Sequence, residues 1–342
     1  MKIAMIGSGG WGTAMMIELS KRNDQLVMYC RNEETARILR ETRYNNEYLE
    51  GIRIPDSISI SSDLEETVTG ASYVILCTPS AVTEETARRI APWLTKDAVV
   101  ICASKGLADN KAHRLSEVIQ SALSGITDNI VALSGPNHAE EVGRGLPTAT
   151  VAASPVPRAV QLAQDLFMSP SFRVYRSQDI KGVEYGGALK NIIALACGVQ
   201  DGLGLGDNCR AALMTRGLVE MTRFGVYFGA RMSTFFGLSG MGDLIATCTS
   251  EHSRNHKAGL FLAKGMTAAD IQSRTHMVVE GIRTAFLVNE IAKRHEIDMP
   301  ITEEVCRVLE GEHSAMDALE ILMGRAKKAE EESYLPGSEY NL

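Results

Sequence analysis

The sequence predicts an α/β fold: an N-terminal Rossmann-like, doubly wound sheet followed by an all-helical C-terminal domain. Three observations lead to this prediction. Short apolar, β-branched runs alternate with amphipathic stretches of helical period through the first half of the chain. A glycine-rich segment joins the first apolar run to the first helical stretch. Beyond Asp179 only helical patterns follow, which indicates a second unit of different architecture.

Six apolar runs are the candidate strands of the sheet. Most are apolar throughout, as strands covered by helices on both faces must be. Because helical stretches separate them, we expect the strands to run parallel. The candidate strands span 3–6, 26–29, 73–77, 99–103, 130–133 and 148–152, and the helical stretches between them span 11–21, 82–94, 113–123 and 157–167.

The second half contains seven helical patterns, at 180–199, 211–228, 253–264, 268–273, 281–295, 302–309 and 315–325. Thr267 and Thr302 stand where helix N-caps are expected. We therefore expect an N-terminal sheet domain over 1–180, a helical domain over 181–330, and a frayed tail over 331–342.

Composition narrows the class of protein. The 342 residues are 45% hydrophobic and 23% charged, which is typical of a globular protein of two domains. The net charge of −7 lacks the basic excess of nucleic-acid binders, so we expect no nucleic-acid partner. A phosphorylated ligand would need a local cluster of donors, since the overall field repels anions. The sequence has no run of about 18 apolar residues, so we expect no integral membrane segment.

The seven cysteines are scattered and form no Cys-x-x-Cys pair. We expect free thiols and, with no signal peptide visible, a cytoplasmic protein. His252 and His256 are four residues apart, as zinc ligands on a helix can be. No glutamate follows the first histidine and no third ligand is evident, so we expect no metal.

The glycine-rich segment fits the G-x-G-x-x-G pattern of dinucleotide-binding folds, with Gly7, Gly9 and Gly12 in the three positions. Gly7 would make the tight turn, Gly9 would let the backbone approach a pyrophosphate, and Gly12 would let the helix pack on the strand. The N–H groups of the helix N-terminus would then face the anion. This context favours a bound dinucleotide over an empty glycine turn.

In dinucleotide-binding folds, residues at the end of the second strand distinguish NAD from NADP. Here this segment is Tyr29-Cys30-Arg31. An acidic residue there would hold the ribose 2′-hydroxyl of NAD, whereas an arginine suits the 2′-phosphate of NADP. Arg31 therefore favours NADP. Glu33 lies close enough in the sequence to keep NAD open.

Lys190 and Asn191 are polar residues in an otherwise apolar helical stretch. Burial lowers the pKa of a lysine and makes its ammonium group a competent proton donor, as carbonyl reduction requires. The alternatives are a lysine that extends to the helix surface or one paired with Glu184. The residues alone leave both possibilities open.

A second polar cluster comprises Ser239-Gly240-Met241-Gly242-Asp243 and, after it, Ser253-Arg254-Asn255. If Ser253 caps a helix, Arg254 and Asn255 lie in its first turn, where helix N–H groups and a guanidinium can bind an anion. Taken alone, this segment is better explained as an ordinary capped helix with an exposed arginine.

Several segments together resemble the bacterial-type NAD(P)-dependent glycerol-3-phosphate dehydrogenases, from the first strand to about residue 325. The motifs that carry the resemblance are residues 7–14, 104–107, 134–142, 187–191, 206–217, 240–244, 253–255 and 279–281. The resemblance implies reversible reduction of dihydroxyacetone phosphate to sn-glycerol 3-phosphate, a phospholipid precursor, by NADPH or NADH. It also implies a homodimer.

The resemblance further implies roles for individual residues. Lys190 would be the catalytic general acid and base. Substrate would be bound by Lys105, Gly135, Asn137, Lys190, Asp243, Ser253, Arg254 and Asn255. The cofactor would be contacted by Gly7, Gly9, Gly10, Trp11, Gly12, Arg31, Lys105, Ala139, Arg254, Val278 and Glu280. Position 137 usually carries a small hydroxyl residue in this family, so the asparagine here puts a side-chain contact with substrate in doubt.

Two other classes of protein fit part of the pattern. One is another two-domain dehydrogenase of the 3-hydroxyacid or 6-phosphogluconate type, which the Gly-Met-Gly-Asp and Ser-Arg-Asn segments disfavour. The other is a dinucleotide sensor without catalysis, which would not need to retain Lys190, Asp243 and Arg254.

Overall fold

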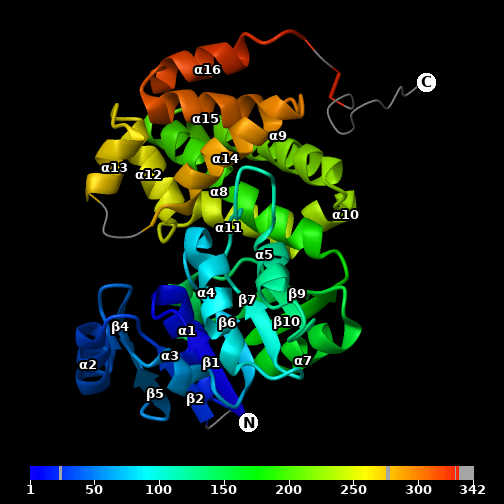
Figure 1. Ribbon diagram of the computed structural model, residues 1–342. Helices are drawn as coiled ribbons and strands as arrows, with labels where there is room; N and C mark the ends of the chain where they lie inside the picture. Colours follow the sequence, from blue (N-terminus) through cyan, green and yellow to red (C-terminus); the bar gives the residue numbers. More distant parts are fainter. Residues whose placement is uncertain (23–24, 275–277, 328, 331–342) are drawn as a thin grey trace.

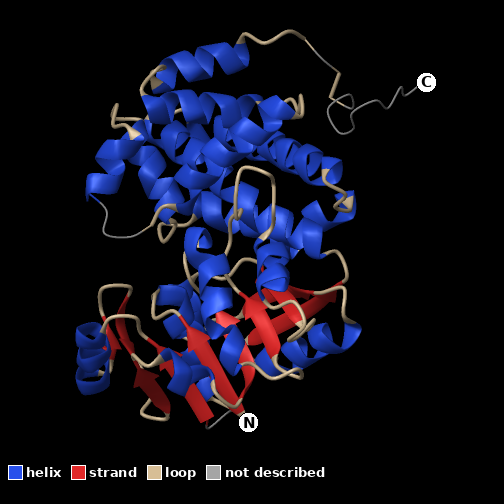
Figure 2. Ribbon diagram, in the orientation of Figure 1, coloured by secondary structure: helices blue, strands red, loops and turns tan. Residues whose placement is uncertain are grey.

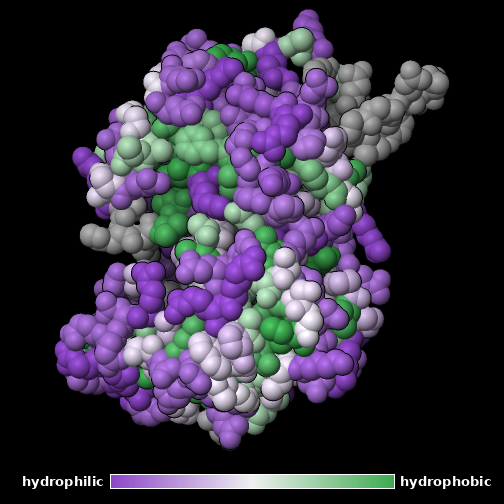
Figure 3. All heavy atoms as spheres, viewed as in Figure 1, coloured by the Kyte–Doolittle hydropathy of each residue, from purple (hydrophilic) through white to green (hydrophobic). Residues whose placement is uncertain are grey.

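The computed structural model describes residues 1–22, 25–274, 278–327 and 329–330. A sheet domain in the N-terminal half lies below a helical part in the view of Figure 1, and Figure 2 shows that every strand lies in the lower part. On this face hydrophilic residues cover most of the surface, and hydrophobic ones form smaller patches in both parts (Figure 3). The tail predicted over 331–342 lies outside the described residues.

The main sheet has eight strands in the order β10-β9-β8-β7-β6-β1-β2-β5. All six predicted strands are present. Their bounds, with those of two strands that were not predicted, are β1 (Lys2–Ile6), β2 (Gln25–Tyr29), β5 (Ile58–Ser61), β6 (Ala71–Leu76), β7 (Val99–Cys102), β8 (Ile130–Ser134), β9 (Thr148–Ala153) and β10 (Phe172–Ser177).

The sheet is parallel except at one pair, since β9 runs antiparallel to β8. Between these strands the chain forms only the short helix α6 (Ala139–Gly143), whereas a parallel return normally needs a full crossover helix. The two unpredicted strands of this sheet, β5 and β10, are its edges. In β10 buried Phe172 and Val174 alternate with exposed Arg173 and Tyr175, so the strand has no continuous apolar run.

Helices cover both faces of the sheet, as the doubly wound prediction requires. One face packs against α1 (Gly10–Ser20) and α7 (Pro157–Phe167). The other packs against α3 (Leu64–Val68), α4 (Thr83–Ile90) and α5 (Leu115–Ala122). An unpredicted helix, α2 (Glu33–Thr42), follows β2 and precedes the hairpin of β3 (Tyr44–Asn45) and β4 (Leu49–Arg53).

Among the described residues after Asp179 every regular element is a helix, so the prediction of a helical C-terminal region is confirmed. The long buried helix α8 (Ile180–Gly202) packs against α9, α11, α12 and α14. A π-helix (Leu238–Gly242) precedes α11, and the α-helices that follow α8 are α9 (Gly206–Tyr227), α10 (Met232–Phe235), α11 (Asp243–Thr249), α12 (Arg254–Leu262), α13 (Ala268–Arg274), α14 (Glu280–Arg294), α15 (Pro300–Glu310) and α16 (Ala315–Met323).

Glycines let α8 and α12 approach closely. A Cβ atom on Gly259 would lie 2.1 Å from the carbonyl oxygen of Leu195, and one on Gly198 would lie 2.0 Å from that of His256. No side chain therefore fits between the two backbones at this crossing. The crossing fixes the first turn of α12 against the helix that carries Lys190.

The two predicted N-caps have different outcomes. Thr267 accepts a hydrogen bond from the N–H of Asp270, which confirms the first. The prediction for Thr302 is wrong, because α15 begins at Pro300. There the buried carboxylate of Glu220, from α9, accepts the N–H groups of Ile301 and Thr302. A side chain remote in sequence has taken the place of a local cap.

All seven cysteines are free, as predicted. Within the described ranges, none of the helices has the length and apolar character needed to span a bilayer.

Candidate active site

Three charged side chains meet where the sheet domain contacts the helical part. Lys190 on α8 is 5% exposed, and its ammonium group donates to the carboxylate of Asp243 at the start of α11. The second carboxylate oxygen of Asp243 accepts from Lys105 Nζ, which follows β7, at 2.7 Å. Lys190 also donates to Thr247 Oγ1, one turn further along α11, at 2.6 Å. Asp243 thus lies between two ammonium groups from different parts of the fold.

The surroundings of this triad change its acidity. Burial is the largest influence on Lys190 and lowers the pKa of its ammonium to about 7, against the opposing effect of Asp243. Burial would raise the pKa of Asp243, but the charges of Lys105 and Lys190 outweigh it and hold that pKa below its usual value. Asp243 is therefore an anion at neutral pH, and Lys190 can give up or take a proton there.

The two alternative interpretations of Lys190, a side chain that extends to the surface and an ion pair with Glu184, are wrong. Its side chain does not extend to the surface. Glu184 binds elsewhere, since its carboxylate accepts from Arg114 and from the backbone N–H of Ser116. Lys190 is a buried lysine held by one carboxylate and one hydroxyl.

Lys105 is held by the turn that follows β8. Its ammonium group donates to the carbonyl oxygen of Gly135 at 2.9 Å and to Asn137 Oδ1 at 3.0 Å. The amide of Asn137 in turn donates to Thr150 Oγ1 on β9. A Cβ atom at Gly135 would lie 2.8 Å from the Cα of Thr150, so the turn has no room for a side chain there. Asn137 therefore orients the lysine.

The first turn of α12 is capped by a buried serine. Ser253 is 3% exposed, and its hydroxyl accepts the N–H of His256, which confirms the predicted cap. Arg254 and Asn255 occupy the first turn, as expected. The guanidinium of Arg254 is exposed, with a long contact of 3.4 Å to the carbonyl oxygen of Val278.

The side chain of Asn255 has a structural task. Its Nδ2 donates to Asn191 Oδ1 on α8 at 2.9 Å, and its Oδ1 accepts the N–H of Gly281 on α14 at 2.9 Å. The amide thus joins three helices. What Asn255 can offer an anion is its backbone N–H, which has no partner within the helix.

The glycine loop has the geometry that a pyrophosphate requires. Gly7 has φ 123°, and a Cβ there would lie 2.5 Å from the carbonyl oxygen of Cys77. A Cβ on Gly12 would lie 2.2 Å from the carbonyl oxygen of Gly7, so the helix packs directly on the turn. Gly9, in contrast, faces open space, since a Cβ there would meet no atom within 4 Å. The N-terminus of α1 has no side-chain cap and no acidic residue in its first turn, so its N–H groups can receive an anion.

The other predicted cofactor residues differ in their surroundings. A Cβ on Gly10 would be 3.7 Å from the Cβ of Ala139, which places α6 beside the loop. Trp11 is half-buried against the core of the sheet domain. Arg31 is exposed at the end of β2, and Val278 is 50% exposed.

Glu280 connects the two parts of the fold. Its carboxylate accepts the N–H of Ser80 at 2.9 Å and the hydroxyl of Ser80 at 2.6 Å, at the start of a 3-10 helix (Ser80–Val82) after β6. One turn later on α14, Arg283 donates to the carbonyl oxygens of Leu107 and Ala108, in the loop after β7. The contacts of Arg283 hold the segment that carries Lys105.

Sequence reasoning missed several residues of this site, namely Ser80, Thr150, Thr247 and Arg283, and it singled out Asn191 without giving it a role. The sequence could have predicted Thr247, because it lies four residues after Asp243 and therefore on the same helix face. Arg283 had no such signal, since its partners lie about 175 positions earlier in the chain.

The described residues contain no group of three or more His, Cys, Asp or Glu side chains placed to bind a metal ion. His256 Nε2 lies 2.7 Å from a carboxylate oxygen of Asp201, and the ring of His252 lies near that of His138.

Comparison with known proteins identifies the family. The sequence-family model of the NAD-dependent glycerol-3-phosphate dehydrogenase N-terminus matches residues 2–160, and the family model of the C-terminus matches residues 179–320. A glycerol-3-phosphate dehydrogenase [NAD(P)+] of Moorella thermoacetica is 48% identical over 97% of this chain and 98% of its own length. The protein of that name from Bacillus subtilis is 43% identical over 97% and 96%.

A solved structure agrees with these sequence matches. The crystal structure of glycerol-3-phosphate dehydrogenase from Coxiella burnetii superposes with a TM-score of 0.90 at 34% identity, covering 95% of this chain and 99% of that one. The chain belongs to the NAD-dependent glycerol-3-phosphate dehydrogenase family.

Proposed function

We propose that the protein catalyses the reversible reduction of dihydroxyacetone phosphate to sn-glycerol 3-phosphate with NADPH or NADH. The observation that carries this proposal is the buried Lys190, held by Asp243 and facing the same carboxylate as Lys105. Such a lysine supplies the proton that a carbonyl oxygen needs when it becomes an alkoxide. The names of the relatives in Moorella and Bacillus support the same substrate and cofactor.

Lys190 is the proposed general acid in the direction of reduction and the general base in reverse. A bound reduced nicotinamide would supply the hydride to the carbonyl carbon. Lys190 then gives its proton to the carbonyl oxygen, and the neutral amine that results is tolerated because burial already disfavours the ammonium form. Asp243 keeps the ammonium oriented, and Lys105 provides a second positive charge beside the developing alkoxide.

The phosphate of the substrate would bind at the first turn of α12. Arg254 offers an exposed guanidinium, and the N–H groups of the turn capped by Ser253 offer further donors. Asn255 would contribute its backbone N–H. Gly135 and Asn137 would act through Lys105, which they hold. Binding the phosphate at a distance from the carbonyl orients the reacting carbon.

The dinucleotide would lie over the glycine loop. Gly7, Gly9, Gly10 and Gly12 shape the turn, and the N-terminus of α1 receives the pyrophosphate. We assign further cofactor contacts to Trp11, Arg31, Lys105, Ala139, Arg254, Val278 and Glu280. Arg31, at the end of β2, makes NADP the preferred cofactor in this proposal.

We further propose that residues 1–180 and 181–330 act as the dinucleotide-binding and substrate domains, and that the product supplies glycerophospholipid synthesis. The free cysteines suit a reducing compartment, which supports the cytoplasm as the site of action. A homodimer is proposed on the family relationship, and light scattering after size-exclusion chromatography tests it.

The decisive assay mixes the purified protein with dihydroxyacetone phosphate and NADPH or NADH and follows the loss of nicotinamide absorbance. Substrate-dependent oxidation is the expected result. If both cofactors bind and neither is oxidised, the catalytic assignment is wrong. A panel of 3-hydroxyacids and 6-phosphogluconate then tests the related two-domain dehydrogenases, and inactivity on all of them favours a dinucleotide sensor.

A further inference from the structure

Three polar side chains follow β2, where dinucleotide-binding folds choose between NAD and NADP. They differ in what holds them. The side chain of Asn32 caps α2 by accepting the N–H of Thr35 at 3.0 Å. The carboxylate of Glu33 is bound on both oxygens, one by Arg40 and the other by the hydroxyl of Ser62. In the part of the chain that is described, Arg31 has no hydrogen bond or ion pair.

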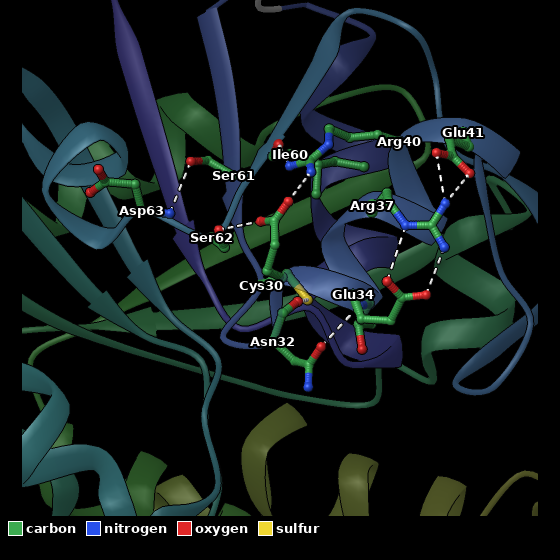
Figure 4. A network of polar contacts seen from close by, with 12 residues as sticks. Cys30, Asn32, Glu34, Arg37, Arg40, Glu41, Ile60, Ser61, Ser62 and Asp63 are labelled. Atoms are coloured by element: carbon green, nitrogen blue, oxygen red, sulfur yellow. Dashed lines mark hydrogen bonds and ion pairs between the residues drawn. The ribbon is translucent and has the colours of Figure 1, made fainter.

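Figure 4 shows this arrangement: Arg40 lies between α2 and the strand end at Ile60, and Ser62 approaches from the segment after β5. Arg40 also donates to the carbonyl oxygen of Ile60 at 3.2 Å, so its guanidinium is anchored to the sheet as well as to the carboxylate. The contact between Glu33 and Ser62 spans two neighbouring strand ends. The acidic side chain nearest the end of β2 is thus already occupied.

We propose that Arg40 and Ser62 are specificity-determining residues: they bind the carboxylate of Glu33, so that Arg31 alone meets the 2′-position of the adenosine ribose and a 2′-phosphate is favoured. The inference rests on the proposed dinucleotide site and deepens it. Arg40 and Ser62 act through Glu33 and are positioning residues.

The charges explain how such an arrangement would work. Hydrogen bonds from Ser62 and then from Arg40 lower the pKa of Glu33, so this side chain is a carboxylate at neutral pH. A carboxylate without partners at this position could accept the ribose 2′-hydroxyl of NAD and would repel the 2′-phosphate of NADP. Paired with Arg40, its charge is compensated, and each of its oxygens already accepts a hydrogen bond.

The same helix provides a matched control. Arg37 also lies on α2 and forms ion pairs, with Glu34 at 2.7 Å and Glu41 at 2.9 Å. Its side chain is 50% exposed, compared with 37% for Arg40. Replacing Arg37 removes the same charge from the same helix without releasing Glu33.

The test measures binding of two probes by calorimetry, without turnover: adenosine 2′,5′-bisphosphate and 5′-AMP. In Arg40→Ala the preference for the bisphosphate over AMP should fall by about 2- to 5-fold, the range that an exposed ion pair accounts for. Arg37→Ala should leave the preference unchanged. The double variant Glu33→Gln/Arg40→Ala should restore it, since no released carboxylate remains. The ratio of kcat/KM for NADPH and NADH should follow the same order.

Three outcomes would overturn the inference. The preference could be unchanged in Arg40→Ala, or it could fall equally in Arg37→Ala, which would indicate a general charge effect. It could also stay low in the double variant, which would make Arg40 a direct ligand of the phosphate. Failure of the proposed function is distinguishable, because the wild-type protein would then bind the probes but not oxidise NADPH with dihydroxyacetone phosphate.

Discussion

The carboxylate of Asp243 joins Lys190 and Lys105, accepting Lys190 on one oxygen and Lys105 on the other. The two lysines come from opposite sides of the boundary between the sheet domain and the helices. One anion therefore serves two cations in a buried setting, where an unpaired charge would be costly. This arrangement keeps a proton donor inside the protein while leaving its pKa low enough to release the proton.

Replacing Lys190 tests the proton-transfer role. In Lys190→Ala, turnover of dihydroxyacetone phosphate should fall by about 10²-fold or more, as the loss of a general acid does. The dissociation constant for NADPH should remain close to that of the wild type. Lys181→Ala is the control, since this lysine lies on the same helix and donates to the carbonyl oxygen of Phe228. A large loss of cofactor binding in Lys190→Ala would instead mark Lys190 as structural.

The pH profile of reduction should report the low pKa of Lys190. Reduction needs the protonated amine, so kcat/KM should be highest below about pH 7 and should fall as the pH rises through that value. In Asp243→Asn the neighbouring anion is lost, and the pKa of Lys190 should fall further. The falling limb should then move to lower pH. A limb that stays in place would show that another group controls the profile.

The sequence predicted those features that local patterns encode. The interior strands are apolar throughout, and the glycine spacing, the cap at Ser253 and the polar Lys190 in an apolar helix are all visible within a few residues. The edge strands were missed because β5 and β10 alternate polar and apolar residues. An α helix at 33–42 was missed because its face toward the protein is small, with only Ala36 and Leu39 buried.

Contacts between residues remote in sequence explain the remaining differences. The partner of Lys190 was not evident, since Asp243 lies 53 positions away. The carboxylate that caps α15 comes from Glu220, about 80 positions earlier, so a local cap at Thr302 was the wrong expectation. The contacts of the Asn255 side chain with Asn191 and Gly281 were also not visible in the sequence, so the predicted contact of Asn255 with substrate stays a prediction that rests on its backbone N–H.

Arg283 should control the position of Lys105. Arg283→Ala removes donors to the carbonyl oxygens of Leu107 and Ala108 and should lower kcat/KM by about tenfold, the effect of losing a charged hydrogen bond. Arg294→Ala is the matched control, because Arg294 also lies on α14 and donates to the carbonyl oxygen of Asn110. Steady-state kinetics with NADPH compare the two. An equal loss in both variants would rule out a specific role for Arg283.

Glu220 should make stability depend on pH. Burial raises its pKa to about 7, so the folded state binds more protons than the unfolded state between about pH 4.5 and 7. The contribution of this group to stability therefore decreases as the pH rises through that window. Glu220→Gln does not titrate at this position. The Tm of the variant minus the Tm of the wild type should therefore be larger at pH 8.5 than at pH 5.5. Thermal unfolding followed by circular dichroism at both values measures the change, and a constant difference in Tm would contradict it.

Two neighbouring residues of α12 should have different roles, Arg254 in substrate binding and Asn255 in the stability of the fold. Arg254→Ala removes an exposed guanidinium and should raise KM for dihydroxyacetone phosphate by about tenfold or more with little change in Tm. Asn255→Ala breaks the contacts with Asn191 and Gly281 and should lower the free energy of unfolding by about 1–3 kcal/mol, because buried polar groups lose their partners. Substrate kinetics and denaturant unfolding on both variants test this division. If Arg254→Ala lowered stability and left KM unchanged, the phosphate could not be held where we place it, since the exposed guanidinium of that turn would then serve the fold.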